Sequence, residues 1–97
     1  MSIVLPPDQG AALLWLRQAG GRAGCDSAGN LSVGRNRCPL VFAPFDRLNQ
    51  LGLVEMRLPS DKAECRLWVL VTEAGAALEI DPAAERRLDQ LIRRFDD

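Results

Sequence analysis

Residues 53–71 read LVEMRLPSDKAECRLWVLV, and this stretch decides the fold. Within it, residues 54–58 and 63–71 alternate apolar and polar side chains, as strands with one buried face do. Residues 59–62, which lie between them, include proline, serine and aspartate, which favour a turn. The stretch therefore predicts a two-stranded antiparallel β-hairpin. Its second strand places four apolar side chains on one face: Cys65, Leu67, Val69 and Val71.

Two helices are predicted before the hairpin. Residues 9–19 predict the first helix, because Asp8 can cap its first turn and two glycines follow its last residue. Residues 44–51 predict a shorter second helix, which begins at a proline and ends at Gly52. The inward face of this short helix consists of Phe45, Leu48 and Leu51.

The segment between these two helices, residues 20–39, contains five glycines, so we expect no long regular helix there. Residues 30–34 alternate polar and apolar side chains and predict one short strand. The glycine spacing matches neither of the common phosphate-binding motifs. The segment is therefore expected to be largely irregular.

Helical signals return after the hairpin. Thr72 is expected to cap a helix that begins at residue 73. At Asp81-Pro82 this helix is expected either to kink or to restart as the last helix, within residues 79–97. The last helix carries an apolar stripe at helical spacing: Leu88, Leu91, Ile92 and Phe95. Two interpretations of this stripe stay open. It either covers the domain's own core or forms the interface of a two-fold homodimer.

Length and composition limit the number of domains, the location and the classes of function that we expect for this chain. Its 97 residues fit a single domain spanning 1–97, and no apolar run reaches the roughly 18–20 residues of a membrane span. The first residues lack the basic region of a signal peptide, so we expect a cytoplasmic protein with no membrane partner. The chain has no histidine, the usual general base, and its three cysteines are widely spaced. We therefore expect structural thiols, no cofactor, no metal site and no enzymatic activity.

The formal net charge of −1 argues against a strongly basic nucleic-acid coat protein, but the charge is unevenly placed. Residues 1–60 carry six basic and four acidic side chains, a balance of +2. Residues 61–97 carry six basic and nine acidic side chains, a balance of −3. A mild positive bias therefore falls on the part of the chain that contains the short helix.

The order of these elements resembles bacterial winged helix-turn-helix regulators of the multiple-antibiotic-resistance type. Residues 48–54 (LNQLGLV) resemble the end of the recognition helix in that family. Residues 71–78 (VTEAGAAL) resemble the return of its wing into the next helix. The resemblance, which is best over residues 44–78, implies an α+β, winged helix-like fold with a two-stranded β-hairpin wing and a C-terminal helix. It also implies a prokaryotic or phage transcription regulator that binds double-stranded DNA, commonly as a dimer.

The resemblance places DNA contacts on three parts of the chain. In this hypothesis the glycine-rich segment and the wing hold phosphates, and the short helix faces base edges. The residues concerned are Arg35, Arg37, Arg47, Asn49, Gln50, Lys62 and Arg66.

An alternative function stays open: a protein–protein interaction module on a winged-helix fold that has lost its DNA chemistry, such as a phage or mobile-element inhibitor or an adaptor. Three departures from the family favour it. Residues 27–37, where the family carries a regular helix, are glycine-rich and strand-like. The short helix offers a single arginine, and residues 60–64 at the wing tip are nearly neutral.

Overall fold

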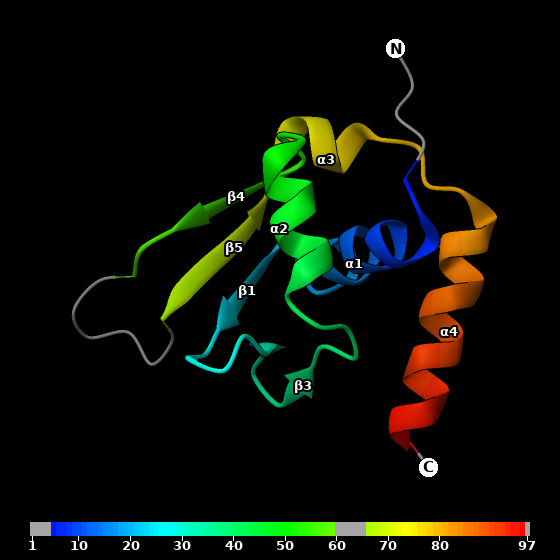
Figure 1. Cartoon of the computed structure of the whole chain (residues 1–97), viewed down its shortest axis with the longest axis horizontal. Helices are drawn as coiled ribbons and strands as arrows, with labels where there is room; N and C mark the ends of the chain where they lie inside the picture. The colour runs from blue at the N-terminus through cyan, green and yellow to red at the C-terminus, as the bar shows by residue number, and fades with distance from the viewer. Residues whose placement is uncertain (1–4, 60–65, 97) are drawn as a thin grey trace.

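An antiparallel β-sheet with helices packed against one side makes up the fold in the computed structural model, which describes residues 5–59 and 66–96 (Figure 1). The helices in these ranges are α1 (Pro7–Gln18), α2 (Ala43–Gln50), α3 (Glu73–Ala77) and α4 (Pro82–Asp96). The strands are β1 (Arg22–Cys25), β2 (Leu31–Val33), β3 (Asn36–Arg37), β4 (Val54–Arg57) and β5 (Leu67–Val71). The chain is thus an α+β protein, as the sequence predicts.

The predicted hairpin is present as the antiparallel pair β4–β5, whose register runs from Val54 opposite Val71 to Arg57 opposite Trp68. The predicted turn at residues 59–62 and the first residues of the second predicted strand extend outside the described residues. The pair does not stand alone as a wing, because β5 also pairs antiparallel with β1. The sheet order is β3-β2-β1-β5-β4, so β5 lies inside the sheet and β4 at its edge.

The glycine-rich segment is more regular than its composition suggests. It contains the expected strand, seen as β2, but also β1 and β3, which the sequence pattern does not predict. In β1, Ala23 and Cys25 are buried, while Arg22 and Gly24 point to the opposite face. These small buried side chains produce little apolar signal, and pairing with β5 stabilises the strand instead.

Helices α1 and α2 cover one face of the sheet. Trp15 of α1 lies edge-on to Phe45 of α2, with ring centroids 6.4 Å apart, and both rings are buried in the core. Leu13, Leu16 and Leu48 complete this layer. One expectation for α1 is wrong, because Pro6, not Asp8, occupies the N-cap position and no side chain caps the helix. Two glycines with positive φ, Gly20 and Gly21, end α1 as predicted.

Thr72 joins the end of the sheet to α3. Its hydroxyl donates to the carbonyl oxygen of Gly52 at 2.8 Å and accepts from the amide of Gly75 at 3.1 Å. The predicted helix cap at Thr72 is therefore confirmed. Gly75 lies against the carbonyl group of Leu53, where a side chain has no room. The segment after α2 and the start of α3 are thereby held together.

The last helix, α4, packs along α1 on the side away from the sheet (Figure 1). Leu88 is buried between the two helices and Leu91 packs against the core. At the periphery, Arg87 Nε donates to Asp8 Oδ1 at 2.7 Å. None of the helices in the described ranges is long and apolar enough to span a membrane.

Candidate functional site

The exposed side of α2 carries Arg47, Asn49 and Gln50, as the sequence predicts. Two of these side chains, however, bind to their neighbours along the helix. Arg47 Nη1 donates to Gln50 Oε1 at 3.0 Å, and Gln50 Nε2 donates to Asp46 Oδ2 at 3.2 Å. The charges of Arg47 and Asp46 also offset each other. This side of α2 is therefore close to neutral, and part of its hydrogen-bonding capacity is used within the helix.

No described helix precedes α2 in the place where the family resemblance implies one. The structure has the β2–β3 hairpin there, followed by residues 38–42 in non-helical conformation. A recognition helix normally enters the major groove while a preceding helix crosses the backbone. The arrangement of α2 thus lacks the partner helix that this docking geometry uses.

The other predicted contact residues do not gather around α2. Arg35 lies at the turn of the β2–β3 hairpin and Arg37 on β3, whereas the last turn of α2 lies at the opposite end of the molecule, next to α3 (Figure 1). Arg66 is exposed just before β5 and lines a hollow with Asp26, Phe42 and others. Lys62 lies outside the described residues.

A second candidate surface lies on the open face of the sheet, opposite α1 and α2. Strand pairing aligns one residue from each of the five strands in a row across this face. Directly opposed residues in neighbouring strands point to the same side. The row consists of Arg37, Ser32, Gly24, Trp68 and Arg57. The sequence indicates Arg37 as one DNA contact among several and does not predict this row.

A second row on the same face runs through Arg22, Leu70 and Glu55. Arg22 lies diagonally across from Trp68, and its guanidinium carbon is 4.7 Å from the centroid of the indole ring. This cation–π contact places the arginine over the only described aromatic side chain of the open face. Arg22 itself is exposed, and Trp68 is half-buried.

A hollow of about 540 Å³ opens beside Trp68 on this face. Gly24 lies in it between Trp68 and Ser32 and contributes no side chain, which leaves that flank of the indole ring uncovered. Arg22, Asp26 and Gly34 lie at its edges. The hollow is open and its lining is mixed, with Ala19, Ala23 and Val33 beside the polar groups, unlike the enclosed apolar pocket of a typical small-molecule site.

The acidic groups of this region are already engaged. Backbone amides of Asn30 and Ala28 donate to Asp26 Oδ1, and these bonds, with that of Asn30 foremost, lower the pKa of Asp26. The hydrogen bond from Arg57 Nε to Glu55 at 2.8 Å lowers the pKa of Glu55 and raises that of Arg57. The two ion pairs among described residues, this one and Arg87–Asp8, include neither Arg22 nor Arg37, and the charge of Arg37 contributes to the lowered pKa of Asp26.

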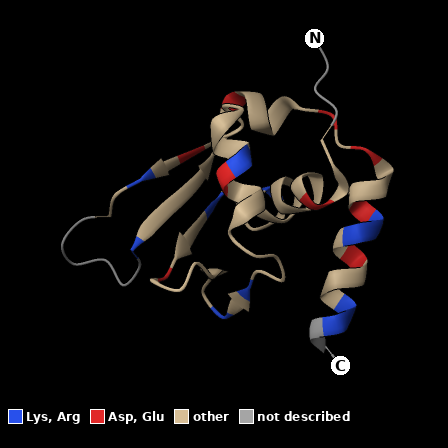
Figure 2. Cartoon of the chain, viewed as in Figure 1, with Lys and Arg blue, Asp and Glu red and all other residues tan. Residues whose placement is uncertain are grey.

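Basic side chains outnumber acidic ones on the sheet, and α4 also carries four arginines (Figure 2). The sheet strands and their immediate connections carry Arg22, Arg35, Arg37, Arg57 and Arg66 against Asp26 and Glu55. The acidic side chains of the rest of the described chain lie mostly on α3, α4 and the link between them, at Glu73, Glu79, Asp81, Glu85 and Asp89. The sheet and its connections are therefore a basic part of a chain that is slightly acidic as a whole, and the arginines of α4 form a separate group.

The two described thiols, Cys25 and Cys38, are buried. Burial raises the pKa of the Cys38 thiol to about 11, so the thiol stays protonated at neutral pH. Cys25 is also buried, and Cys65 lies outside the described residues. Among the described residues no three cysteine or carboxylate side chains are grouped as a metal site requires.

The apolar stripe of α4 is divided between core and surface. Leu88 is buried, Leu91 is half-buried against the core, and Ile92 is 37% exposed, while the side chain of Phe95 lies outside the described residues. The part of the stripe nearest the start of α4 therefore covers the chain's own core. The homodimer stays a prediction, and Ile92 is the described residue of the stripe that is free to serve it.

Comparisons of this chain with protein-family models, with curated proteins and with solved structures gave no match. The candidate site consequently rests on the geometry and the charges described above.

Proposed function

We propose that this chain is a nucleic-acid-binding domain of winged helix-like arrangement, whose contact surface is the open face of the sheet with the β2–β3 hairpin. The observation that carries the proposal is the placement of Arg22 and Arg37 on one exposed face by two different strands, beside Arg57, which is paired with Glu55. Guanidinium groups on one surface attract the phosphates of a polyanion and displace its counterions.

The neighbouring carboxylates offset this attraction only in part, because two of them face five arginines on the strands and their connections. Asp26 accepts backbone hydrogen bonds within its own turn, and Glu55 pairs with Arg57. Arg22 and Arg37 remain outside any ion pair on the open face, and Arg35 is exposed at the turn of the neighbouring β2–β3 hairpin. A positive surface on a chain of net charge −1 favours a polyanionic partner that contacts one side only.

The order of α1, the β2–β3 region, α2, the β4–β5 pair and α3 supports a winged helix-like arrangement, with β4–β5 in the position of the wing. In this proposal α2 contributes little to binding, because its arginine is bonded to Gln50 and offset by Asp46. Transcription regulation through duplex DNA is the form of nucleic-acid binding that the family resemblance suggests.

The test is equilibrium binding of the full chain to labelled duplex and single-stranded oligonucleotides, by fluorescence anisotropy at low and moderate salt. We expect salt-sensitive binding to at least one of the two. Replacing Arg35 and Arg37 by Gln should weaken it. The slope of log K against log salt should also fall by about 0.7–0.9 for each phosphate that the variant no longer neutralises.

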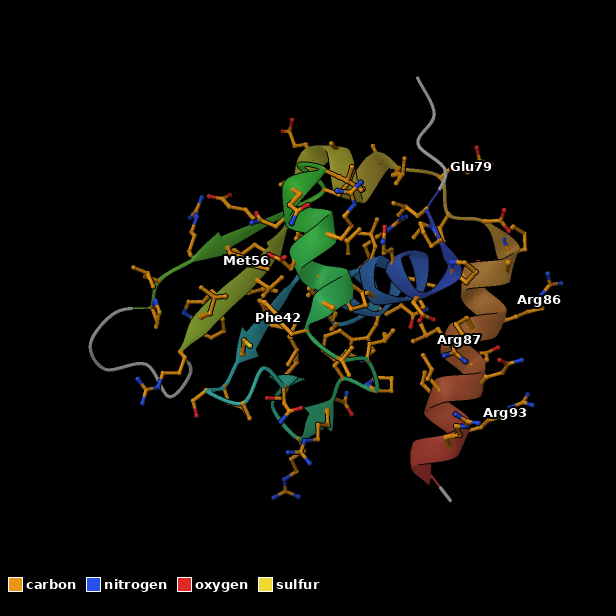
Figure 3. All side chains as sticks on the ribbon, viewed as in Figure 1. Phe42, Met56, Glu79, Arg86, Arg87 and Arg93 are labelled. Atoms are coloured by element: carbon orange, nitrogen blue, oxygen red, sulfur yellow. The ribbon has the colours of Figure 1, made fainter. Side chains whose placement is uncertain are left out.

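The matched control replaces two exposed arginines of α4, Arg86 and Arg93, which project away from the sheet (Figure 3). This double variant changes the net charge of the chain by the same amount, so the proposal requires it to bind more tightly than the Arg35/Arg37 variant. Absence of binding to both oligonucleotides at low salt would contradict the proposal and favour the protein-interaction alternative.

A further inference from the structure

We propose that the open face of the sheet takes single-stranded nucleic acid, with a base stacked on the Arg22–Trp68 pair and phosphates held by the flanking arginines. This inference rests on the proposed function and narrows it to one class of nucleic acid. Trp68 is the residue that suggests it, because the other described tryptophan, Trp15, is buried in the core.

The neighbours of Trp68 leave its ring partly accessible and place the exposed guanidinium group of Arg22 over it. On one side the opposed residue is Gly24, which has no side chain, and the hollow of about 540 Å³ opens there. Diagonally across, the guanidinium group of Arg22 lies over the ring, 4.7 Å from its centroid. Indole rings and guanidinium planes are both surfaces on which unpaired bases stack.

Charge and polarity continue in both directions along the row that contains Trp68. Arg57 is its direct partner on β4, and on the other side Ser32 and Arg37 follow beyond Gly24. Five strands at a spacing of about 4.8 Å make this row roughly 19 Å long. The row is therefore long enough for more than one nucleotide, with Arg37 available to a phosphate at one end, Arg57 in its pair with Glu55 at the other, and a stacking surface between them.

The geometry favours a single strand over a duplex. In a duplex the faces of the bases are stacked on each other, so Trp68 has no base face to contact. Elements that read duplex DNA in its grooves are a helix or a projecting two-stranded ribbon. Trp68 and Arg22 lie instead on β5 and β1, inside a five-stranded sheet. An acidic peptide matches the arginines but makes no use of the stacked pair.

The experiment measures binding of the full chain to a 15-nucleotide oligothymidylate and to a 15-base-pair duplex of mixed sequence at low salt. We expect tighter binding of the single strand. Trp68→Leu should weaken that binding about 10- to 100-fold, as removal of one aromatic stacking partner does, and Trp68→Phe should restore part of it. Trp15→Phe, which changes a tryptophan of the core, is the matched control and should bind as the unchanged chain does.

The Trp15→Phe variant also gives a direct optical readout, because Trp68 is then the only tryptophan left. Stacking of a base on it predicts quenching of its fluorescence that saturates with the binding curve. Circular dichroism and thermal unfolding of Trp68→Leu establish that the sheet is intact. If Trp68→Leu is unfolded, the quenching in Trp15→Phe still decides the question.

Several outcomes overturn the inference while leaving the proposed function standing. They are stronger binding of the duplex, single-strand binding that Trp68→Leu does not change, and binding without quenching of Trp68. Displacement of the oligonucleotide by polyglutamate at equal charge concentration also overturns it and indicates a protein partner. Failure of both oligonucleotides to bind contradicts the proposed function itself.

Discussion

Gly10 of α1 lies against Ala84 of α4 so closely that a Cβ atom on Gly10 would be 2.6 Å from the Cβ of Ala84. Both positions lie within helices, so this contact sets how closely the two helices approach. It also fixes α4 on its own domain, close to the buried Leu88. Because α4 docks on α1, no described helix covers the open face of the sheet, which lies opposite α1 and α2.

The close approach predicts that Gly10→Val is destabilising. The added side chain has no room beside Ala84, and overpacking of this kind costs about 1–3 kcal/mol of unfolding free energy. Gln18→Val, at an exposed position of the same helix, introduces the same side chain without the clash. Helix propensity alone favours the Gly10 change, since valine is a better helix former than glycine. Urea unfolding should nevertheless show Gly10→Val to be the less stable variant, and equal stabilities would mean that α4 is not docked as described.

The division of the α4 stripe gives a second prediction. Leu88→Ala should lower the unfolding free energy by about 2–5 kcal/mol, because it removes a fully buried side chain. Ile92→Ala should cost far less, since Ile92 is 37% exposed. Sedimentation of Ile92→Glu beside the unchanged chain tests the homodimer separately. A dimer that persists in this variant would exclude Ile92 from its interface.

Arg17 gives a third prediction. Its Nη1 donates to the carbonyl oxygen of Leu78 at 2.9 Å and so links α1 to the segment between α3 and α4. A hydrogen bond from a charged donor contributes about 1.5–3 kcal/mol, and partial exposure places this one at the lower end. Arg17→Met keeps most of the aliphatic stem and should lose that contribution in thermal unfolding, whereas Arg86→Met should not. Equal melting temperatures for the two variants would contradict the contact.

The hairpin and the α2–β4 connection could be predicted from sequence because their signals are local. Alternation in residues 54–58 and the sequence of residues 48–54 each specify a structure within a few residues. Strand β1 could not be predicted in this way, since its buried residues are only Ala23 and Cys25 and two glycines precede it. Its conformation depends on pairing with β5, which is more than 40 residues away in sequence.

The candidate site could not be predicted from the sequence either, because it too depends on strand pairing between distant residues. Trp68 belongs to an alternating strand, and alternation alone shows only that it lies on the face opposite Val69. Its proximity to Arg22 arises from the register between β1 and β5. The predicted contacts on α2, in turn, depended on the family resemblance, and the observed bonds of Arg47 and Gln50 are set by side-chain spacing along that helix.

The buried thiol of Cys38 predicts a pH dependence. Burial raises its pKa from 9.0 to about 11, so the folded chain holds this proton at pH values where the unfolded chain releases it. The stability linked to this thiol is therefore fully present below pH 9 and declines as the pH rises from 9 to 11. Urea unfolding across this range should show a steeper decline for the unchanged chain than for Cys38→Ala. Identical slopes would show that the Cys38 thiol is not shielded from water.

The most direct test of the central claim, that the open face of the sheet binds nucleic acid, is an NMR titration of the ¹⁵N-labelled chain with a 15-nucleotide oligothymidylate. We expect chemical-shift changes at the amides of β1 and β5 and at the indole Nε1–H of Trp68, with the amides of α2 nearly unchanged. Shifts confined to α2, with β1, β5 and the Trp68 indole unaffected, would contradict the claim.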